Sequence, residues 1–107
     1  MNNETEIIFE VIDKTGRKIR LTNKQWKHIQ KHPYMHNSLE RIKETIKNPT
    51  AIKYDEIKEK INYFYREYKD MELVERYLFV SVNYLNGEGF IITSFYTNKI
   101  TGEKWKI

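Results

Sequence analysis

The chain has 107 residues, which is room for one domain with one modest hydrophobic core. Eight tyrosines, five phenylalanines and two tryptophans argue against intrinsic disorder, and the lack of cysteine excludes disulfides and thiolate metal sites. No apolar run reaches the length of a membrane span, and the first six residues lack the pattern of a signal peptide. We therefore expect a cytoplasmic protein without a membrane anchor.

The net charge of +4 is unevenly distributed along the chain. Residues 14–36 contain seven lysines and arginines and no acidic residue, whereas the rest of the chain has more acidic than basic residues. Such clustering is typical of a surface that meets phosphate groups. A solvated face with no binding role would have the same composition, so the charge alone does not decide between the two.

A β-hairpin is the first structure that the sequence predicts. Residues 7–13 are rich in β-branched side chains, and residues 14–16 have the composition of a turn. A short second strand is predicted at residues 18–21, which would complete the hairpin.

A helix is predicted directly after this hairpin. Thr22 and Gln25 have the spacing of a capping box, which starts a helix at Thr22. Pro33 disfavours helical geometry in the residue before it, so the helix should stop near Lys31 or His32.

A second helix is predicted after a cap at Ser38. Leu39, Ile42 and Ile46 have the spacing of one buried helical stripe, and the Asn48-Pro49 pair ends the helix. The two helices would form an αα-hairpin.

The second half of the chain has the period of β-strands. The strands are predicted at residues 51–55, 61–68, 76–85 and 89–98, with a further edge strand at 104–107. Residues 86–89, Asn-Gly-Glu-Gly, are predicted to join the last two long strands as a hairpin. We expect a single α+β domain over residues 1–107: an N-terminal β-hairpin, two helices, then an antiparallel sheet of about four strands with the helices packed on one face.

Two histidines in the first predicted helix are candidates for acid–base chemistry. His28 and His32 are four residues apart and lie on the flank of the buried stripe marked by Trp26 and Ile29. Half-buried imidazoles beside positive charge tend to stay neutral near pH 7, and a neutral histidine can act as a general base. Histidines at the edge of a helix can also serve only to cap or pack.

The same histidine spacing is found in zinc sites, but the sequence context is different here. The residue after His28 is Ile29 instead of the glutamate of a metalloprotease helix, and Pro33 disturbs the turn after His32. The chain has no cysteine nucleophile and no serine in a nucleophile elbow. We expect no metal and no cofactor.

Metal-free chemistry at a phosphate remains as the reaction class that these residues favour. RNA supplies its own nucleophile, the 2′-hydroxyl, so an enzyme must add only a base, a cation and a proton donor. Thr93 and Thr97 share one face of the last long strand, and Tyr65 and Arg66 could stack a base and hold a phosphate. Hydroxyls on a half-exposed sheet face and aromatic residues in a core would give the same pattern without any function.

The chain resembles a known group of nucleases at several motifs. These are Trp26-Lys27-His28-Ile29 and His32-Pro33 in the first helix, then segments 42–49 (IKETIKNP), 77–82 (YLFVSV) and 91–97 (IITSFYT). Over about residues 21–97 the sequence resembles the small bacterial and phage proteins grouped with barnase, EndoU, colicin-type and RelE-like nucleases.

The resemblance implies two helices followed by a four-stranded antiparallel sheet. It also implies metal-independent cleavage of RNA and, frequently, a toxin role opposed by an antitoxin or immunity protein. His28 and His32 match the helix histidines of this group, and Thr93 and Thr97 match the threonines of its late strand.

Two positions depart from the pattern of the group. Tyr34 stands where an acidic residue is expected after the His-Pro pair, and Phe95 stands where a phenol is sometimes found.

The leading hypothesis is a ribonuclease that binds RNA and meets an antitoxin or immunity protein. The alternatives are a non-catalytic RNA-binding domain and a protein-interaction module whose basic face meets an acidic partner. The candidate catalytic residues are His28, His32, Thr93, Thr97, Arg66 and Tyr65, and the candidate RNA-binding residues are Lys24, Lys27, Lys31, Arg17 and Arg20.

Overall fold

The computed structural model describes residues 3–55, 57–70, 76–100 and the backbone of residues 105–106. Its strands are β1 (Ile7–Ile12), β2 (Lys18–Thr22), β3 (Ala51–Asp55), β4 (Ile61–Glu67), β5 (Tyr77–Leu85), β6 (Glu88–Thr97) and β7 (Trp105–Lys106). Its helices are α1 (Asn23–Ile29), the short 3₁₀ helix η1 (Met35–Asn37) and α2 (Leu39–Lys47). The predicted order of a hairpin, two helices and then strands is confirmed.

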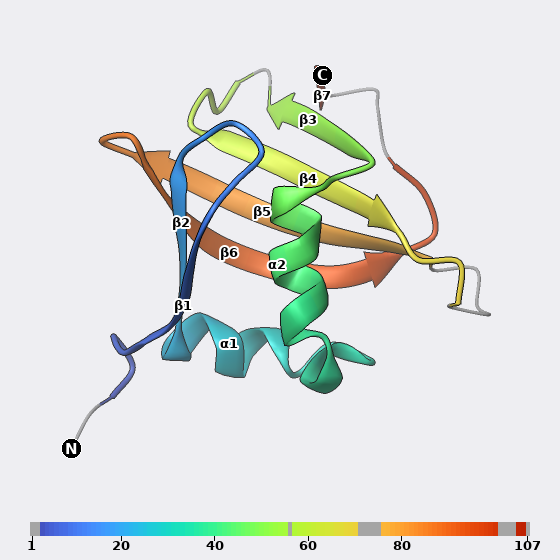
Figure 1. The fold of residues 1–107 in the computed structure, drawn as a ribbon, viewed down its shortest axis with the longest axis horizontal. Coiled ribbons are helices and arrows are strands. Elements are labelled where there is room, and N and C mark those ends of the chain that lie inside the picture. The colour runs from blue at the N-terminus through green and yellow to red at the C-terminus, as the bar shows by residue number, and fades with distance from the viewer. Residues whose placement is uncertain (1–2, 56, 71–75, 101–104, 107) are drawn as a thin grey trace.

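The strands form one mixed sheet in the order β1-β2-β6-β5-β4-β3-β7 (Figure 1). β3, β4, β5 and β6 are a four-stranded antiparallel meander, as predicted. Asn86 and Gly87 both have positive φ angles and make the tight turn between β5 and β6. Of the predicted strand at residues 104–107, Trp105 and Lys106 form β7 beside β3, while Lys104 and Ile107 lie outside the described residues.

The predicted antiparallel sheet of about four strands is thus only part of the sheet, which has seven strands and one parallel pair within the described residues. The N-terminal hairpin joins the same sheet, because β2 pairs with β6 in parallel, with Ile19 opposite Gly89. Gly89 has no side chain on the face where Ile19 is fully buried, so the two strands can approach closely. The sequence contains no local pattern that would show this pairing.

α1 begins as predicted but ends sooner. The side chain of Thr22 caps it by accepting a hydrogen bond of 3.4 Å from the Gln25 N–H. The helix stops at Ile29, and the N–H groups of Lys31 and His32 turn back to the carbonyls of His28 and Ile29 at 3.2 and 3.0 Å. His32 therefore belongs to the turn after α1.

α2 packs on one face of the sheet and buries Ile42, Thr45 and Ile46 (Figure 1). It ends at Lys47, before the Asn48-Pro49 pair, as predicted. Ser38 precedes α2, but its side chain makes no cap hydrogen bond.

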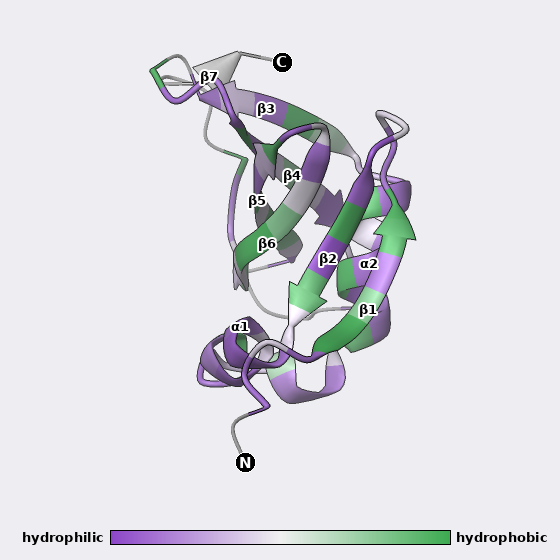
Figure 2. Cartoon of the chain, turned by 90° about the vertical axis from the view of Figure 1, so that its left-hand side faces the viewer, coloured by the Kyte–Doolittle hydropathy of each residue, from purple (hydrophilic) through white to green (hydrophobic). Residues whose placement is uncertain are grey.

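α1 lies at the edge of the sheet beside β6 and contributes Ile29 to the same core as α2 (Figure 1). Its ribbon is mainly purple in Figure 2, the colour of hydrophilic residues. The prediction that both helices pack on one face thus holds fully only for α2. Within the described residues, no helix is long and apolar enough to cross a membrane.

We predict that Gly89→Ala destabilises the fold by about 1–3 kcal/mol, because a methyl group there overpacks the junction between β2 and β6. The new Cβ would lie 2.8 Å from Val82 Cγ1 and closer still to Ile19 Cδ1. Chemical denaturation would measure the loss. Adding Ile19→Val removes the nearest atom, so the double variant should lose less stability than the sum of the single changes. Strict additivity would contradict the prediction.

Candidate active site

The two faces of β6 have different surroundings. On the face toward α2, Ser94 donates a hydrogen bond of 2.8 Å to the Phe79 carbonyl, and the Tyr96 hydroxyl hydrogen-bonds Ser38 at 2.9 Å. Side chains alternate along a strand, so Thr93, Phe95 and Thr97 lie on the other face. All three are partly buried. The shared face predicted for Thr93 and Thr97 is thus present, with an aromatic ring between them.

The turn after α1 places His32 against this face of β6. Its ring centroid is 5.5 Å from that of Phe95, and the His28 ring contacts His32 edge-to-face at 5.9 Å. His32 is partly buried, whereas His28 is exposed. His32, Pro33, Tyr34, Phe95, Tyr96 and Thr97 line an open depression of about 380 Å³. The structure therefore places His32 and Thr97 in one depression and His28 against His32, while Thr93 lies on the same face of β6 but does not line the depression.

Aromatic rings continue from this depression across the sheet. Phe95 contacts Phe79 at 4.8 Å between ring centroids, and Phe79 contacts both Tyr65 at 5.2 Å and Tyr63 at 5.5 Å. Tyr63 and Phe79 are stacked, with 18° between their planes. Tyr65 lies on the same face, but only 3% of this residue is exposed. Its ring therefore packs against its neighbours and is largely closed to solvent.

Tyr63 carries a hydroxyl that is held neutral at the far end of this row. Burial, together with the hydrogen bond of 3.0 Å that it donates to Asp55, raises the pKa of Tyr63 to about 12. The pKa of Asp55 is lowered, mainly because the N–H groups of Lys58 and Ile57 donate to its carboxylate. The row thus ends in a neutral phenol and a charged carboxylate.

The candidate RNA-binding residues differ in whether their charge is paired with a carboxylate. Lys24, Lys27 and Lys31 are exposed, and none of them makes an ion pair within the part of the chain that the structure describes. Arg20 instead pairs with Glu10 and, at 2.9 Å, with Glu88. The uncompensated positive charge therefore lies on and just after α1.

Arg17 lies apart from these lysines, at the tip of the hairpin. Its guanidinium carbon is 3.5 Å from the centre of the Tyr84 ring. Tyr84 is buried in the core on the α2 side of the sheet, so the cation–π contact holds Arg17 there.

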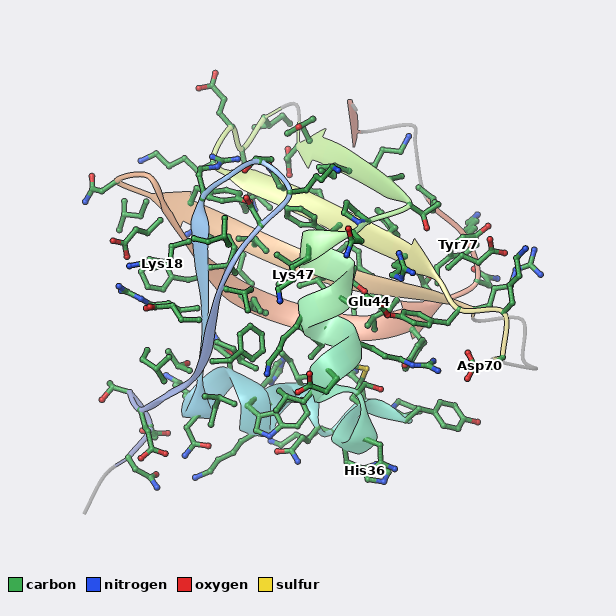
Figure 3. All side chains as sticks on the ribbon, in the orientation of Figure 1. Lys18, His36, Glu44, Lys47, Asp70 and Tyr77 are labelled. Atoms are coloured by element: carbon green, nitrogen blue, oxygen red, sulfur yellow. The ribbon has the colours of Figure 1, made fainter. Side chains whose placement is uncertain are left out.

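Arg66 is the candidate that the structure does not bring to the histidines. It pairs in register with Leu78 of the core face, and it therefore lies on the α2 side of the sheet. There it forms an ion pair of 3.4 Å with Glu44 of α2, which is labelled in Figure 3, and donates to the Asn48 carbonyl at 2.5 Å.

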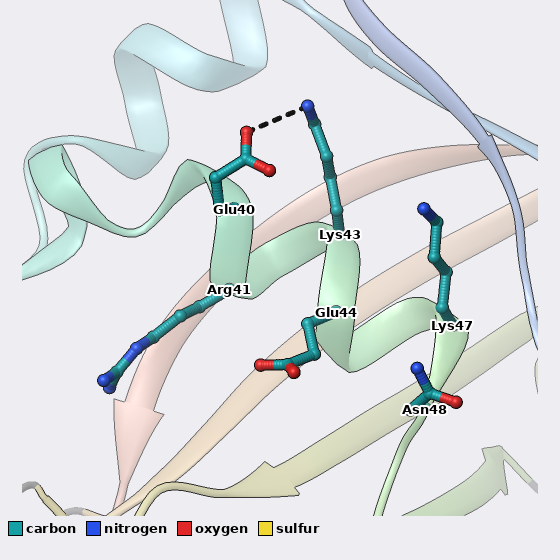
Figure 4. Close-up of a pocket in the computed structure, with 6 residues that line it drawn as sticks. All are labelled: Glu40, Arg41, Lys43, Glu44, Lys47 and Asn48. Atoms are coloured by element: carbon teal, nitrogen blue, oxygen red, sulfur yellow. Dashed lines mark hydrogen bonds and ion pairs between the residues drawn. The ribbon is translucent and has the colours of Figure 1, made fainter.

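A depression on the outer side of α2 is a second candidate, of about 380 Å³ (Figure 4). Its lining residues are Glu40, Arg41, Lys43, Glu44, Lys47 and Asn48. Lys43 pairs with Glu40 at 3.0 Å, so carboxylates offset the positive charge there. The depression also lacks a histidine. The α1–β6 depression is therefore the better candidate site.

Sequence reasoning missed the contribution of Phe95, Phe79 and Tyr34. The strand period already placed Phe95 between the two threonines and Phe79 on the corresponding face of β5, so the signal was present. No sequence signal placed Tyr34 in the depression. No group of three or more metal-ligating side chains occurs among the residues that the structure describes.

Comparison with known proteins identifies one family. The family model described as phage-Barnase-EndoU-ColicinE5/D-RelE like nuclease2 matches residues 3–106. This match confirms the resemblance seen in the sequence. No curated protein and no solved structure matches the chain.

We predict that the Tyr63 phenol titrates near pH 12. NMR of tyrosine labelled at the ring carbon that bears the hydroxyl would follow the titration. The signal that is missing in Tyr63→Phe belongs to Tyr63. Because folding raises this pKa, its contribution to stability is complete below pH 10 and is lost as the pH rises toward 12. Asp55→Asn should lower the pKa, though not fully to 10.0, since burial remains. A wild-type Tyr63 that titrates at 10 would refute this account.

Proposed function

Because the chain belongs to the family of phage-Barnase-EndoU-ColicinE5/D-RelE like nucleases, we propose that it is a ribonuclease that cleaves RNA without a metal ion. The observation that carries this proposal is the contact of His32 with Phe95 in a depression that Thr97 also lines. Histidine, hydroxyl and aromatic groups meet there, next to lysines with no acidic partner in the described structure.

In this proposal Lys24, Lys27 and Lys31 attract and hold the RNA backbone. Their ammonium groups are exposed on one side of α1 and its following turn, so they can reach several phosphates. Arg20 contributes less, because Glu10 and Glu88 offset its charge. Arg17 keeps a structural role at the hairpin tip.

The proposed reaction is an in-line transfer within the RNA. His32 removes the proton of the 2′-hydroxyl, the 2′-oxygen bonds to the adjacent phosphorus, and the bond from phosphorus to the 5′-oxygen breaks. A protonated His28 returns a proton to that leaving oxygen. The products are a 2′,3′-cyclic phosphate and a free 5′-hydroxyl.

His32 is assigned as the base because it lines the depression, whereas His28 is exposed and does not line it. A lysine ammonium at position 27 or 31 stabilises the charge that develops on the phosphate oxygens. Thr97, with Thr93 beyond it, orients the phosphate. We assign no role in catalysis to Arg66, because Glu44 and the Asn48 carbonyl hold it on the other side of the sheet.

The basic surface on α1 also suits an acidic antitoxin or immunity protein, which would cover the lysines and block the RNA. This partner and a toxin role remain part of the proposal.

We predict that the purified protein cleaves single-stranded RNA equally well with and without EDTA and leaves cyclic phosphate ends, which mass spectrometry of the products would detect. DNA of the same sequence should stay intact, because it has no 2′-hydroxyl. Cleavage that disappears with EDTA, or cleavage of the DNA control, would contradict the mechanism.

We predict that His32→Ala and His28→Ala each lower kcat/KM by about 100-fold or more, with the larger loss at His32. The wild-type pH–rate profile should be bell-shaped, because one imidazole must be neutral and the other protonated. Tyr54→Ala is the control, since Tyr54 is exposed on β3, away from the histidines. Growth arrest by the wild type but not by His28→Ala would support the toxin role. Histidine variants that cleave like the control would refute the catalytic assignment.

The second candidate is a non-catalytic RNA-binding domain on the same surface. Phe95 favours it, since a phenylalanine cannot supply the hydroxyl that some members of the wider group place there. RNA binding that weakens steeply with salt, without cleavage and without an effect of the histidine substitutions, would select this candidate.

A further inference from the structure

Tyr34 occupies a backbone conformation that a bulky residue rarely adopts. Its φ angle of 67° lies in the left-handed region, which is costly for a side chain of this size. The surrounding contacts fix it there. Ser38 Oγ donates to the Tyr34 carbonyl at 2.9 Å and also hydrogen-bonds the buried Tyr96 hydroxyl, and the next residue, Met35, is fully buried.

The ring of Tyr34 contacts a neighbour on one side and remains half exposed. One side meets Tyr96 edge-to-face, with 6.4 Å between the ring centroids. Half of the residue is accessible to solvent, so one face of the ring is open to a ligand. A rigid aromatic ring with an open side can stack on a planar ligand at little entropic cost.

Tyr34 stands between two depressions. On one side is the site of His32 and Thr97; on the other is a depression of about 300 Å³ that Tyr34 and Tyr96 share with Arg41 and Asp70. Asp70, labelled in Figure 3, is 63% exposed and pairs with Arg41 at 2.6 Å. Arg41 also lies over the ring of Tyr68, with its guanidinium carbon 4.1 Å from the ring centre.

We infer that Tyr34 is a positioning residue that stacks on the base next to the scissile phosphate, and that Arg41 binds the following phosphate in the second depression. This inference rests on the proposed ribonuclease function. An exposed ion pair such as Arg41–Asp70 is weak, so a phosphate can take the place of the Asp70 carboxylate. The guanidinium is already oriented by the ring of Tyr68 and needs little rearrangement.

The arrangement defines the substrate as RNA with an unpaired base at this position. A base inside an A-form helix is stacked on its neighbours and cannot also stack on Tyr34. Stacking requires only an aromatic face, so this contact is tolerant of base identity. Tyr34 therefore selects single strands over duplexes.

The test uses binding of a fluorescent 2′-O-methyl RNA hexamer, which cannot be cleaved. We predict that Tyr34→Ala weakens binding about 10-fold or more, while Tyr34→Phe stays within about 3-fold, because the ring and not the hydroxyl does the stacking. Tyr54→Ala, which removes an exposed tyrosine on β3, should bind like the wild type. Arg41→Gln should weaken the hexamer but not a dinucleotide that ends before the second depression.

The outcomes separate this inference from the proposed function. If Tyr34→Ala binds the hexamer as the wild type does, or if Tyr34→Phe loses as much as Tyr34→Ala, the inference is overturned whether or not the wild type cleaves RNA. A Tyr34-dependent hexamer affinity in a protein without cleavage activity supports the stacking contact of Tyr34 but refutes the catalytic proposal and, with it, the assignment to a scissile phosphate. A wild type that binds no hexamer overturns the inference, and the cleavage assay then decides the proposed function by itself. Thermal unfolding of each variant shows whether the fold is retained.

Discussion

The parallel pairing of β2 with β6 determines where the histidines lie. β2 runs in the same direction as β6, with Lys18 to Arg20 beside Glu88 to Phe90. Because α1 starts directly after β2, it must continue beside the second half of β6, where Thr93 and Thr97 are. An antiparallel pairing would have sent α1 toward the β5–β6 turn and separated the two groups. The missing side chain at Gly89 lets these strands meet without displacing Ile19.

One face of the sheet forms the hydrophobic core, and the other face carries the candidate site. The face under α2 carries the core, and the buried Asp13 carboxylate there accepts hydrogen bonds from Thr15, from the Arg17 N–H and from the Tyr84 hydroxyl. Burial, and then this hydrogen bond to Asp13, raises the pKa of Tyr84. These bonds tie the hairpin tip to β5. The opposite face of the sheet, with its row of aromatic rings, is thus supported by a packed core, as a binding or catalytic site requires.

Local patterns in the sequence were sufficient for the elements and for part of the site. The capping box at Thr22 gave the start of α1, and the strand period gave the shared face of Thr93 and Thr97. The helix predicted to carry both histidines ends at Ile29, so His32 lies in the turn after it. The pairing of residues 18–20 with residues 88–90 has no local signature, so the mixed sheet could not be predicted. Adjacent strand residues face opposite ways, so Tyr65 and Arg66 could never both have met the histidines, and alternation alone would have shown this.

The residues of the candidate site come from distant parts of the sequence, so the site forms late during synthesis of the chain. His32 precedes Thr97 by more than half of the sequence, and β6 is the strand that joins the N-terminal hairpin to the meander. On a ribosome, the first half of the chain can form the hairpin and helices but has no surface to place them against. The candidate site thus forms only after Thr97 has been synthesised, so a truncated product of translation would carry His28 and His32 without their partners on β6.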